Sequence, residues 1–337
     1  MSVAVLGAGS WGTTVAALLA QRTPTVLWAR SEAVADELRR QRTNVAYLGS
    51  FKVPASLGAT ASLAEALQEA DVVVLAIPSH GVRQVLVEAA PFVRPRATVL
   101  SLTKGLEEHT MARMSEVVGE CWPGCPVGVL TGPNLAAEVC AGQPTASVIA
   151  YRDENLAASV RALFATDALR IYTNPDVTGC EIAGVAKNVM AIASGMAIGL
   201  GLGDNTRAAL ITRSLAELTR LGVALGGDPP TFAGLAGLGD LVATCTSAKS
   251  RNFSVGVSLG EGTTLSEATG STRMVAEGVR SCRPVLELAN RLGVDVPVTE
   301  QVVAVCHGGR SPREAIPILM RRAPKSEVDP LVFGADR

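Results

Sequence analysis

Short, uninterrupted apolar runs recur through the first half of this 337-residue chain. Most of them are separated by stretches with apolar residues at helical spacing, such as residues 13–21, 31–41 and 62–70. Buried parallel strands read as continuous apolar runs, and their alternation with helices is typical of a doubly wound α/β sheet. The runs span residues 3–7, 25–29, 71–77, 97–102, 126–130, 146–150 and 168–172. The sequence therefore predicts an N-terminal doubly wound sheet.

From about residue 178 the sequence changes character. Residues 178–200 are almost wholly apolar or small, and residues 205–225 carry arginines separated by apolar residues at helical spacing. The pattern predicts an α/β chain in three parts. These are a doubly wound sheet domain over residues 1–178, an all-helical domain over residues 179–322 and a loose tail over residues 323–337.

Lys187 lies near the middle of an apolar segment, residues 181–203, that is long enough to cross a membrane. The ammonium group and many glycines argue against a membrane span, so we expect a buried helix of a soluble protein. Desolvation lowers the pKa of a buried lysine, which suits proton transfer near neutral pH. A structural ion pair with Asp240, or a side chain that reaches solvent, explains the same lysine equally well.

The charge balance and the cysteines limit the class of partner. A formal net charge of −1 gives no general attraction to nucleic acid or anionic lipid, so we expect a small-molecule substrate. Seven scattered cysteines and an apolar run that already begins at Val3, with no leader before it, predict a cytoplasmic protein with reduced thiols. Cys121 and Cys125 form a C-x3-C pair without a second pair or clustered histidines, so we expect no metal site.

Gly7, Gly9 and Gly12 form a G-x-G-x-x-G pattern directly after the first apolar run and at the start of a helical stretch. This context is typical of the Rossmann dinucleotide-binding turn. There the first glycine allows a tight turn, the second lets a pyrophosphate approach the backbone, and the third lets helix and strand pack closely. An ordinary glycine-rich turn is the alternative. Trp11 either lies against the cofactor or packs locally.

Arg30 stands at the end of the second run, where NAD-specific proteins usually carry an acidic residue. An arginine there can pair with a 2′-phosphate, which favours NADP(H). Glu32 is close enough in sequence to serve NAD(H) instead. A solvated arginine without a binding role is the remaining alternative.

Polar and basic residues also follow later runs. Lys104 comes just after residues 97–102, at the edge of the sheet where such folds bind ligands, although a surface lysine in a turn explains it too. Ser250, Arg251 and Asn252 follow a glycine-rich stretch that ends at Asp240. Arg251 offers a planar fork suited to phosphate, and its neighbours can add hydrogen bonds. A solvated polar loop is the alternative for these three residues.

An ordered series of motifs resembles one family, the bacterial-type NAD(P)-dependent glycerol-3-phosphate dehydrogenases. The series runs from residue 7 to about residue 280, with "VPVTEQV" beyond, and so many ordered blocks are far more specific than any one of them. The motifs are "GAGSWGT", "TKGLE", "TGPNLAAE", "YTNPDVTGCEIAGVAKNVMAI", "GLGDNTRAALITRSLAELTRLG", "GLAGLGDLVATCTS", "SRN" and "MVAEGVR".

The resemblance implies a Rossmann domain, a helical substrate domain and an active site between them. It implies reversible hydride transfer between NAD(P)H and dihydroxyacetone phosphate, which yields sn-glycerol 3-phosphate for phospholipid synthesis, in a cytoplasmic enzyme expected to be a homodimer. Lys187 is then the general acid and base, Asp240 lies beside it, and Lys104 binds substrate and polarises the site.

The resemblance also implies two sets of binding residues. The substrate set is Lys104, Gly132, Asn134, Lys187, Asn188, Asp240, Ser250, Arg251 and Asn252. The cofactor set is Gly7, Gly9, Ser10, Trp11, Gly12, Arg30, Lys104, Ala136, Arg251, Val275 and Glu277. Asn134 departs from the family pattern, which usually has serine or threonine after "GP", and this places its contact with substrate in question.

Two rival functions remain open from the sequence. A related Rossmann dehydrogenase that acts on another small hydroxyacid or phosphate, such as ketopantoate, also uses a lysine but has no reason for the "SRN" motif. A non-catalytic NADPH-binding sensor on the same scaffold would tolerate the loss of Lys187 and Asp240, yet both are present.

Overall fold

The computed structural model describes residues 1–270, 276–323 and 326, which fall into two compact units. The sheet unit comprises residues 1–103 and 112–177, and the helical unit comprises residues 104–111 and the chain from Thr178 onward. The short detour segment 104–111 therefore belongs to the helical unit, although the chain on both sides of it belongs to the sheet unit. The single boundary near residue 178 that the sequence predicted does not include this detour. The expected tail, residues 323–337, lies almost wholly outside the described residues.

The sheet unit contains an eight-stranded sheet in the order β3-β2-β1-β4-β5-β6-β7-β8. Neighbouring strands are parallel except for the antiparallel pair β6–β7. The strands are β1 Val3–Leu6, β2 Thr25–Trp28, β3 Leu57–Thr60, β4 Val72–Leu75, β5 Thr98–Ser101, β6 Val127–Thr131, β7 Thr145–Ala150 and β8 Leu169–Asn174. All seven predicted strands are present, and the predicted fold class, a doubly wound sheet followed by a helical region, is confirmed.

Strand β3 was absent from the sequence-based prediction. Its sequence is Leu-Gly-Ala-Thr, which lacks the run of large β-branched residues that marks the other strands. Pairing with one neighbour forms it, because β3 is the edge strand and matches β2 in register from Thr25 opposite Leu57 to Trp28 opposite Thr60. Tertiary pairing therefore overrides a weak local preference here.

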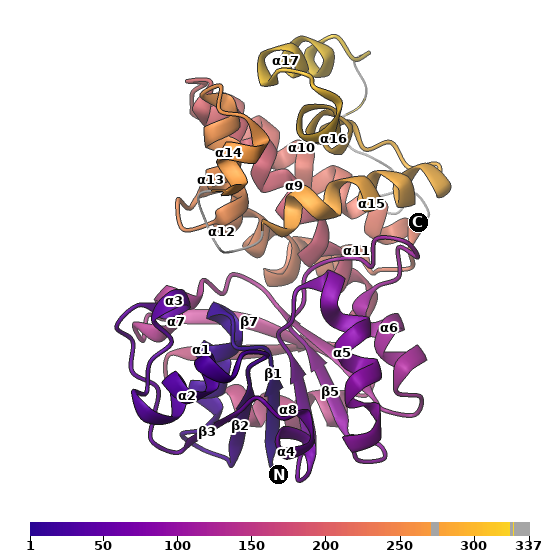
Figure 1. Ribbon diagram of the computed structural model, residues 1–337. Coiled ribbons are helices and arrows are strands. Elements are labelled where there is room, and N and C mark those ends of the chain that lie inside the picture. The colour runs from indigo at the N-terminus through magenta and orange to yellow at the C-terminus, as the bar shows by residue number, and fades with distance from the viewer. Residues whose placement is uncertain (271–275, 324–325, 327–337) are drawn as a thin grey trace. The chain divides into compact units, whose positions relative to one another are not determined.

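Helices cover both faces of the sheet, as Figure 1 shows. Val3, Val5 and Val74 belong to a core with residues of α1, α2 and α8, whereas Ala4, Leu6 and Leu75 belong to a core with α4, α5 and α6. The alternation follows from the two-residue period of a strand. The helices are α1 Ser10–Leu19, α2 Glu32–Arg40, α3 Val45–Leu48, α4 Leu63–Leu67, α5 Val82–Ala89, α6 Met114–Cys121, α7 Ala136–Cys140 and α8 Glu154–Phe164.

The helical unit is built around α9, which is long and apolar enough to cross a membrane. The structure buries 89% of its most apolar window inside the protein, which is the expected buried core helix. The helices are α9 Val177–Gly199, α10 Asp204–Ala224, α11 Pro229–Ala233, α12 Asp240–Thr246, α13 Arg251–Gly260, α14 Leu265–Gly270, α15 Glu277–Arg291, α16 Pro297–Gly308 and α17 Pro312–Met320.

Helices α9 and α13 touch through glycines. A Cβ on Gly256 would collide with the carbonyl oxygen of Ile192 and lie 2.9 Å from the Cα of Gly195. One turn further on, a Cβ on Gly199 would lie 3.0 Å from the Cα of Gly260. The two backbones therefore approach more closely than any side chain permits, and this contact holds α13 against the helix that carries Lys187.

A buried carboxylate joins α10 to α16. Glu217, 1% exposed, accepts hydrogen bonds from the backbone N–H of Val298 at 2.8 Å and of Thr299 at 2.9 Å. It also accepts the Thr299 hydroxyl at 2.6 Å. These contacts satisfy first-turn N–H groups that a helix leaves unpaired, while burial raises the pKa of Glu217 to about 7.

We expect Gly256→Ala to lower the thermal unfolding midpoint of the protein by about 2–10 °C. The added methyl group forces α9 and α13 apart, and such overpacking costs about 1–3 kcal/mol. The matched control is Gly119→Ala on α6, where a Cβ meets nothing within 4 Å and alanine is the better helix former. Calorimetry on both variants checks this, and an equal midpoint for the two would contradict the close helix contact.

Candidate functional site

Two lysines share one buried carboxylate in the helical unit. The Lys187 ammonium donates to Asp240 Oδ1 at 2.6 Å, and the Lys104 ammonium donates to Asp240 Oδ2 at 2.7 Å. The side chains of Lys187, Asp240 and Lys104 are 8%, 2% and 16% exposed. The alternative of a solvated surface lysine is wrong for Lys104. The ion pair between Lys187 and Asp240 that the sequence suggested is present.

Three separate segments bring these charges together. Lys187 lies in the buried middle of α9, and Lys104 comes from the detour segment 104–111, which Leu106 anchors in the core of the helical unit. Asp240 begins α12 directly after a π-helical turn, Leu235–Gly239, in which the Gly239 N–H reaches the carbonyl of Gly234 at 3.1 Å. Such turns are rare and occur often at functional sites.

Thr244 supports Lys187 from the same helix as Asp240. Lys187 Nζ donates to Thr244 Oγ1 at 2.7 Å, and this hydroxyl donates to the Asp240 carbonyl oxygen at 2.6 Å. Two of the three ammonium hydrogens of Lys187 are thus directed to fixed acceptors. The sequence analysis missed Thr244, although its place four residues after Asp240 on one helix puts both on the same face.

The burial of this cluster shifts its pKa values. Burial lowers the pKa of the Lys187 ammonium to about 8; the Asp240 charge opposes this shift and the Lys104 charge adds to it. Burial alone would raise the pKa of Asp240, but the charges of Lys104 and Lys187 outweigh it and hold the pKa below its usual value. The site therefore keeps a carboxylate ionised beside a lysine that can exchange its proton near neutral pH.

A second polar network continues from Lys187 along α9. Asn252 Nδ2 donates to Asn188 Oδ1 at 3.0 Å, and Asn252 Oδ1 accepts the Gly278 N–H at 2.9 Å. Asn188 Nδ2 donates in turn to the carbonyl of Gly184 at 3.3 Å. The first turns of α13 and α15 are thereby tied to α9. Among the described residues each amide nitrogen makes one such hydrogen bond, which leaves its second hydrogen for another acceptor.

Ser250 and Arg251 occupy the start of α13. Ser250 is the N-cap residue, and its hydroxyl accepts the Phe253 N–H at 3.3 Å. Arg251 is the first residue of the helix and its side chain is exposed. The structure therefore brings Lys104, Lys187, Asn188, Asp240 and Asn252 into bonded groups, with Ser250 and Arg251 adjacent to Asn252 in the chain.

The glycine-rich turn in the sheet unit follows β1, beside β4, where the strand order reverses. A Cβ on Gly7 or Gly12 would collide with backbone, at Ala76 and at Gly7 respectively, whereas Gly9 faces open space. Gly7 has a φ of +117°, a conformation that side chains disfavour. These observations fit a turn that a dinucleotide pyrophosphate approaches at Gly9.

Two further residues of the predicted cofactor set lie at the start of α1. Ser10 donates its hydroxyl to the carbonyl of Tyr47 at 3.3 Å. Trp11 packs against the core of the sheet unit, and its buried indole N–H meets no acceptor among the residues that the structure describes. Local packing of Trp11 and an indole N–H left for a ligand are both compatible with this position.

Arg30 and Glu32 lie beyond β2. Arg30 is exposed two residues after the strand ends at Trp28. Glu32 is engaged by Arg39 in an ion pair on α2. The contact involves one oxygen of a carboxylate whose side chain is 64% exposed.

For the remaining predicted residues we describe the position in the chain, the backbone conformation and the burial. Gly132 follows β6 with a φ of +121°, a region strained for any side chain, and a Cβ there would lie 3.2 Å from the Cα of Ser147. Asn134 is partly buried and Ala136 begins α7. Glu277 begins α15, and Val275 lies outside the described residues.

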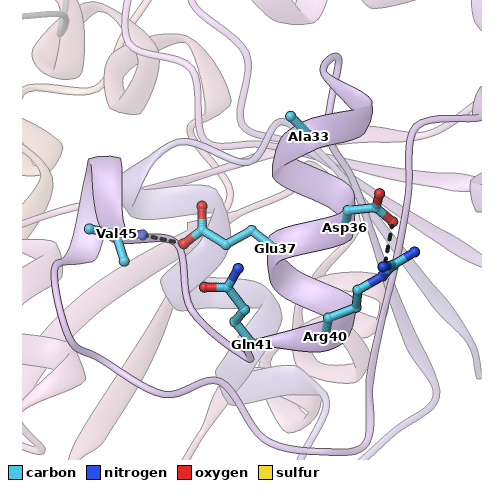
Figure 2. Close-up of a pocket in the computed structure, with 6 residues that line it drawn as sticks. All are labelled: Ala33, Asp36, Glu37, Arg40, Gln41 and Val45. Carbon is cyan, nitrogen blue, oxygen red and sulfur yellow. Dashed lines mark hydrogen bonds and ion pairs between the residues drawn. The ribbon is translucent and has the colours of Figure 1, made fainter.

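A surface hollow of about 500 Å³ lies against α2 and the start of α3 (Figure 2). None of the predicted substrate or cofactor residues lines it. Its lining residues are Ala33, Asp36, Glu37, Arg40, Gln41 and Val45. Within the described ranges, no group of three or more His, Cys, Asp or Glu side chains is arranged to hold a metal ion.

Comparisons with known proteins agree along almost the whole chain. Sequence models of the N-terminus and the C-terminus of NAD-dependent glycerol-3-phosphate dehydrogenase match residues 2–157 and 176–317. A glycerol-3-phosphate dehydrogenase [NAD(P)+] of Sphingopyxis alaskensis is 49% identical over 330 residues, which is 98% of this chain and 99% of the relative. One of Streptomyces coelicolor is 50% identical over 330 residues, covering 97% and 98% of the two chains.

Solved structures give the same result. The crystal structure of glycerol-3-phosphate dehydrogenase from Coxiella burnetii superposes with a TM-score of 0.92 at 36% identity, covering 95% of this chain and 99% of that one. A ketopantoate reductase family structure from Ralstonia eutropha has a TM-score of 0.60 at 18% identity, covering 94% and 100%, and so shares the fold alone. The chain belongs to the NAD-dependent glycerol-3-phosphate dehydrogenase family and is an NAD(P)-dependent oxidoreductase.

Proposed function

We propose that this chain interconverts dihydroxyacetone phosphate and sn-glycerol 3-phosphate, with Lys187 as the group that donates and accepts the proton. The observation that carries this proposal is the buried ammonium of Lys187, held at 2.6 Å from Asp240 and 2.7 Å from Thr244, with its pKa lowered to about 8. Family membership supports the reaction class.

The chemistry needs one hydride and one proton. Bound NAD(P)H supplies the hydride to the carbonyl carbon of the ketone. As the carbonyl oxygen gains negative charge, Lys187 Nζ gives it a proton and becomes a neutral amine. In the reverse direction the amine takes the hydroxyl proton of glycerol 3-phosphate as the hydride passes from its carbon to NAD(P)+. A lysine with a pKa near the working pH serves both directions.

Asp240 and Lys104 set the charge around the group that transfers the proton. The two ammonium groups and one carboxylate carry a formal net charge of +1, which suits a substrate that develops negative charge at oxygen. When Lys187 loses its proton, Asp240 still has Lys104 as a partner at 2.7 Å. The carboxylate is thus never left buried and unpaired, a state that is strongly unfavourable.

The substrate phosphate is proposed to bind at the start of α13. Arg251 offers a charged fork there, and Asn188 and Asn252 are oriented by their mutual hydrogen bond at 3.0 Å. Ser250, Gly132 and Asn134 complete the proposed substrate set. Asn134 is included as a carboxamide that can still donate and accept a hydrogen bond, in place of the usual hydroxyl.

The cofactor proposed is NADP(H) in preference to NAD(H). Exposed Arg30 is available to a 2′-phosphate, whereas Glu32 is engaged by Arg39. The proposed cofactor set remains the one that the resemblance implies. It consists of Gly7, Gly9, Ser10, Trp11, Gly12, Arg30, Lys104, Ala136, Arg251, Val275 and Glu277.

The cellular setting is part of the proposal. We infer a cytoplasmic homodimer without nucleic-acid partners or stable membrane insertion, which supplies glycerol phosphate for phospholipid synthesis. Oxidation of NADPH followed by absorbance, with dihydroxyacetone phosphate as substrate and ketopantoate in parallel, separates this function from that of a related dehydrogenase. Tight NADPH binding without turnover of either substrate would instead indicate a sensor.

We expect Arg251→Ala to raise the KM for dihydroxyacetone phosphate roughly tenfold to a hundredfold. A hydrogen bond to a charged group is worth about 1.5–3 kcal/mol, and the phosphate loses one such partner. The matched control is Lys249→Met, which removes an exposed cation two residues away. Steady-state kinetics decide this, and an unchanged KM in folded Arg251→Ala would remove this residue from the phosphate site.

We expect Arg30→Asp to raise the KM for NADPH by roughly tenfold or more and to change that for NADH far less. A carboxylate at this position repels the 2′-phosphate, whereas arginine attracts it. Arg40→Asp, at the other end of α2, makes the same charge change as a control. Kinetics with both cofactors test this, and an equal loss for NADPH and NADH would show that Arg30 acts through structure alone.

We expect Lys187→Met to lower kcat by roughly 10²–10⁴ while the protein stays folded and binds NADPH, because methionine keeps the apolar stem and removes the proton donor. The thermal midpoint should change little, since Asp240 retains Lys104. Lys52→Met removes an exposed ammonium as the control.

The pH dependence gives a second readout for Lys187. Ketone reduction needs the ammonium form, so wild-type kcat should fall as the pH rises through about 8. Glycerol phosphate oxidation needs the amine and should show the opposite trend. Folded Lys187→Met should lose this ionisation, and near-wild-type turnover in that variant would rule out the proposed mechanism.

A further inference from the structure

Asn44 is a buried asparagine between α2 and α3, and it is 0% exposed. It stands at the N-cap position of α3, but its side chain makes no bond to that helix. Its Nδ2 instead donates to the carbonyl oxygen of Ala8 at 2.9 Å and to the hydroxyl of Thr13 at 2.9 Å. Asn44 therefore bonds to the glycine-rich turn at Ala8 and to the first turn of α1 at Thr13.

The orientation of the Asn44 carboxamide follows from its partners. A carbonyl oxygen only accepts, so the group that faces Ala8 must be the amide nitrogen. The opposite atom, Oδ1, is buried and meets no hydrogen-bond donor among the described residues. A buried polar atom without a partner is unusual in a folded protein. The Asn44 carboxamide thus directs its N–H groups at the turn, although this orientation leaves its own oxygen without a hydrogen-bond donor.

The Ala8 carbonyl and the Gly9 N–H belong to one peptide unit and point in opposite directions, because the described peptide bonds are all trans. By holding the Ala8 carbonyl on its own side, Asn44 keeps the Gly9 N–H on the other. A Cβ on Gly9 would meet nothing within 4 Å, and the N-terminus of α1 has no side-chain cap. An anion is attracted by N–H groups and repelled by a carbonyl oxygen.

The segment that carries Asn44 is also hydrogen-bonded to α2. Glu37 on α2 accepts the Val45 N–H at 2.7 Å, a contact drawn in the wall of the surface hollow in Figure 2. Thr43, adjacent to Asn44, is also buried, but its hydroxyl meets no partner within the described residues. Of these two buried neighbours, the side chain of Asn44 is hydrogen-bonded to the turn and the side-chain hydroxyl of Thr43 has no hydrogen bond to the described residues.

We propose that Asn44 is a positioning residue for the cofactor pyrophosphate. It holds the peptide between Ala8 and Gly9 with the N–H toward the ligand and the carbonyl away from it. This inference rests on the proposed binding of a dinucleotide at the glycine-rich turn. It assigns to Asn44 a binding role that it exercises without touching the ligand.

The test compares two ligands that differ in the pyrophosphate. Adenosine 2′-monophosphate lacks it, and 2′-phospho-ADP-ribose contains it. We expect Asn44→Ala to raise the Kd of 2′-phospho-ADP-ribose about tenfold and to leave that of adenosine 2′-monophosphate within twofold, as measured by calorimetry. In turnover, the KM for NADPH should rise while kcat at saturating NADPH stays within twofold.

Two further variants serve as controls. Thr43→Val removes the neighbouring buried hydroxyl and should change neither Kd. Asn44→Asp keeps the side-chain volume but removes the donors, and it should show the same ligand-selective loss if Asn44→Ala does not fold. An Asn44 variant with a lower thermal midpoint but an unchanged ratio of the two Kd values would overturn the proposal. If wild-type protein binds neither of these ligands nor ADP-ribose, which lacks the 2′-phosphate, the proposed dinucleotide site fails and this inference fails with it.

Discussion

The proposed active site depends on one carboxylate shared between two ammonium groups. A single buried lysine would lose its proton or require a full counterion, and either outcome would make it a poor proton donor. Asp240 lies 2.6 Å from Lys187 and 2.7 Å from Lys104, so the cluster keeps its carboxylate paired in both protonation states of Lys187. Because burial lowers the pKa of Lys187 to about 8 while Asp240 opposes the shift, the lysine is balanced between its two forms.

The helix that carries Lys187 is packed closely within its unit. The glycines that bring α9 and α13 into backbone contact leave no side-chain layer between them, with a Cβ on Gly256 meeting the Gly195 Cα at 2.9 Å. The Asn188–Asn252–Gly278 network then ties the starts of α13 and α15 to the same helix. Apolar packing supplies the stability of this unit, and the hydrogen bonds orient its polar side chains.

Sequence patterns predicted the parts of the fold that depend on local periodicity. Seven strands and the long apolar helix are continuous apolar runs, and the glycine-rich turn has a fixed spacing. Strand β3 escaped detection because four small or weakly apolar residues carry little local preference, and its pairing with β2 decides its conformation. Thr244 and Asn44 escaped because single polar residues gain meaning only from the atoms that they face.

The sequence by itself determined that the chain forms a doubly wound sheet followed by helices, and its ordered motifs placed it in one dehydrogenase family. It also identified Lys187 as an ammonium group inside an apolar helix. Only the tertiary structure decided that Lys104 belongs to the helical unit and shares Asp240 with Lys187, and that Asn44 holds the Ala8 carbonyl. The physical reason is that periodicity reports the faces of single elements, whereas ion pairs and hydrogen bonds join residues 136 and 36 positions apart in the chain.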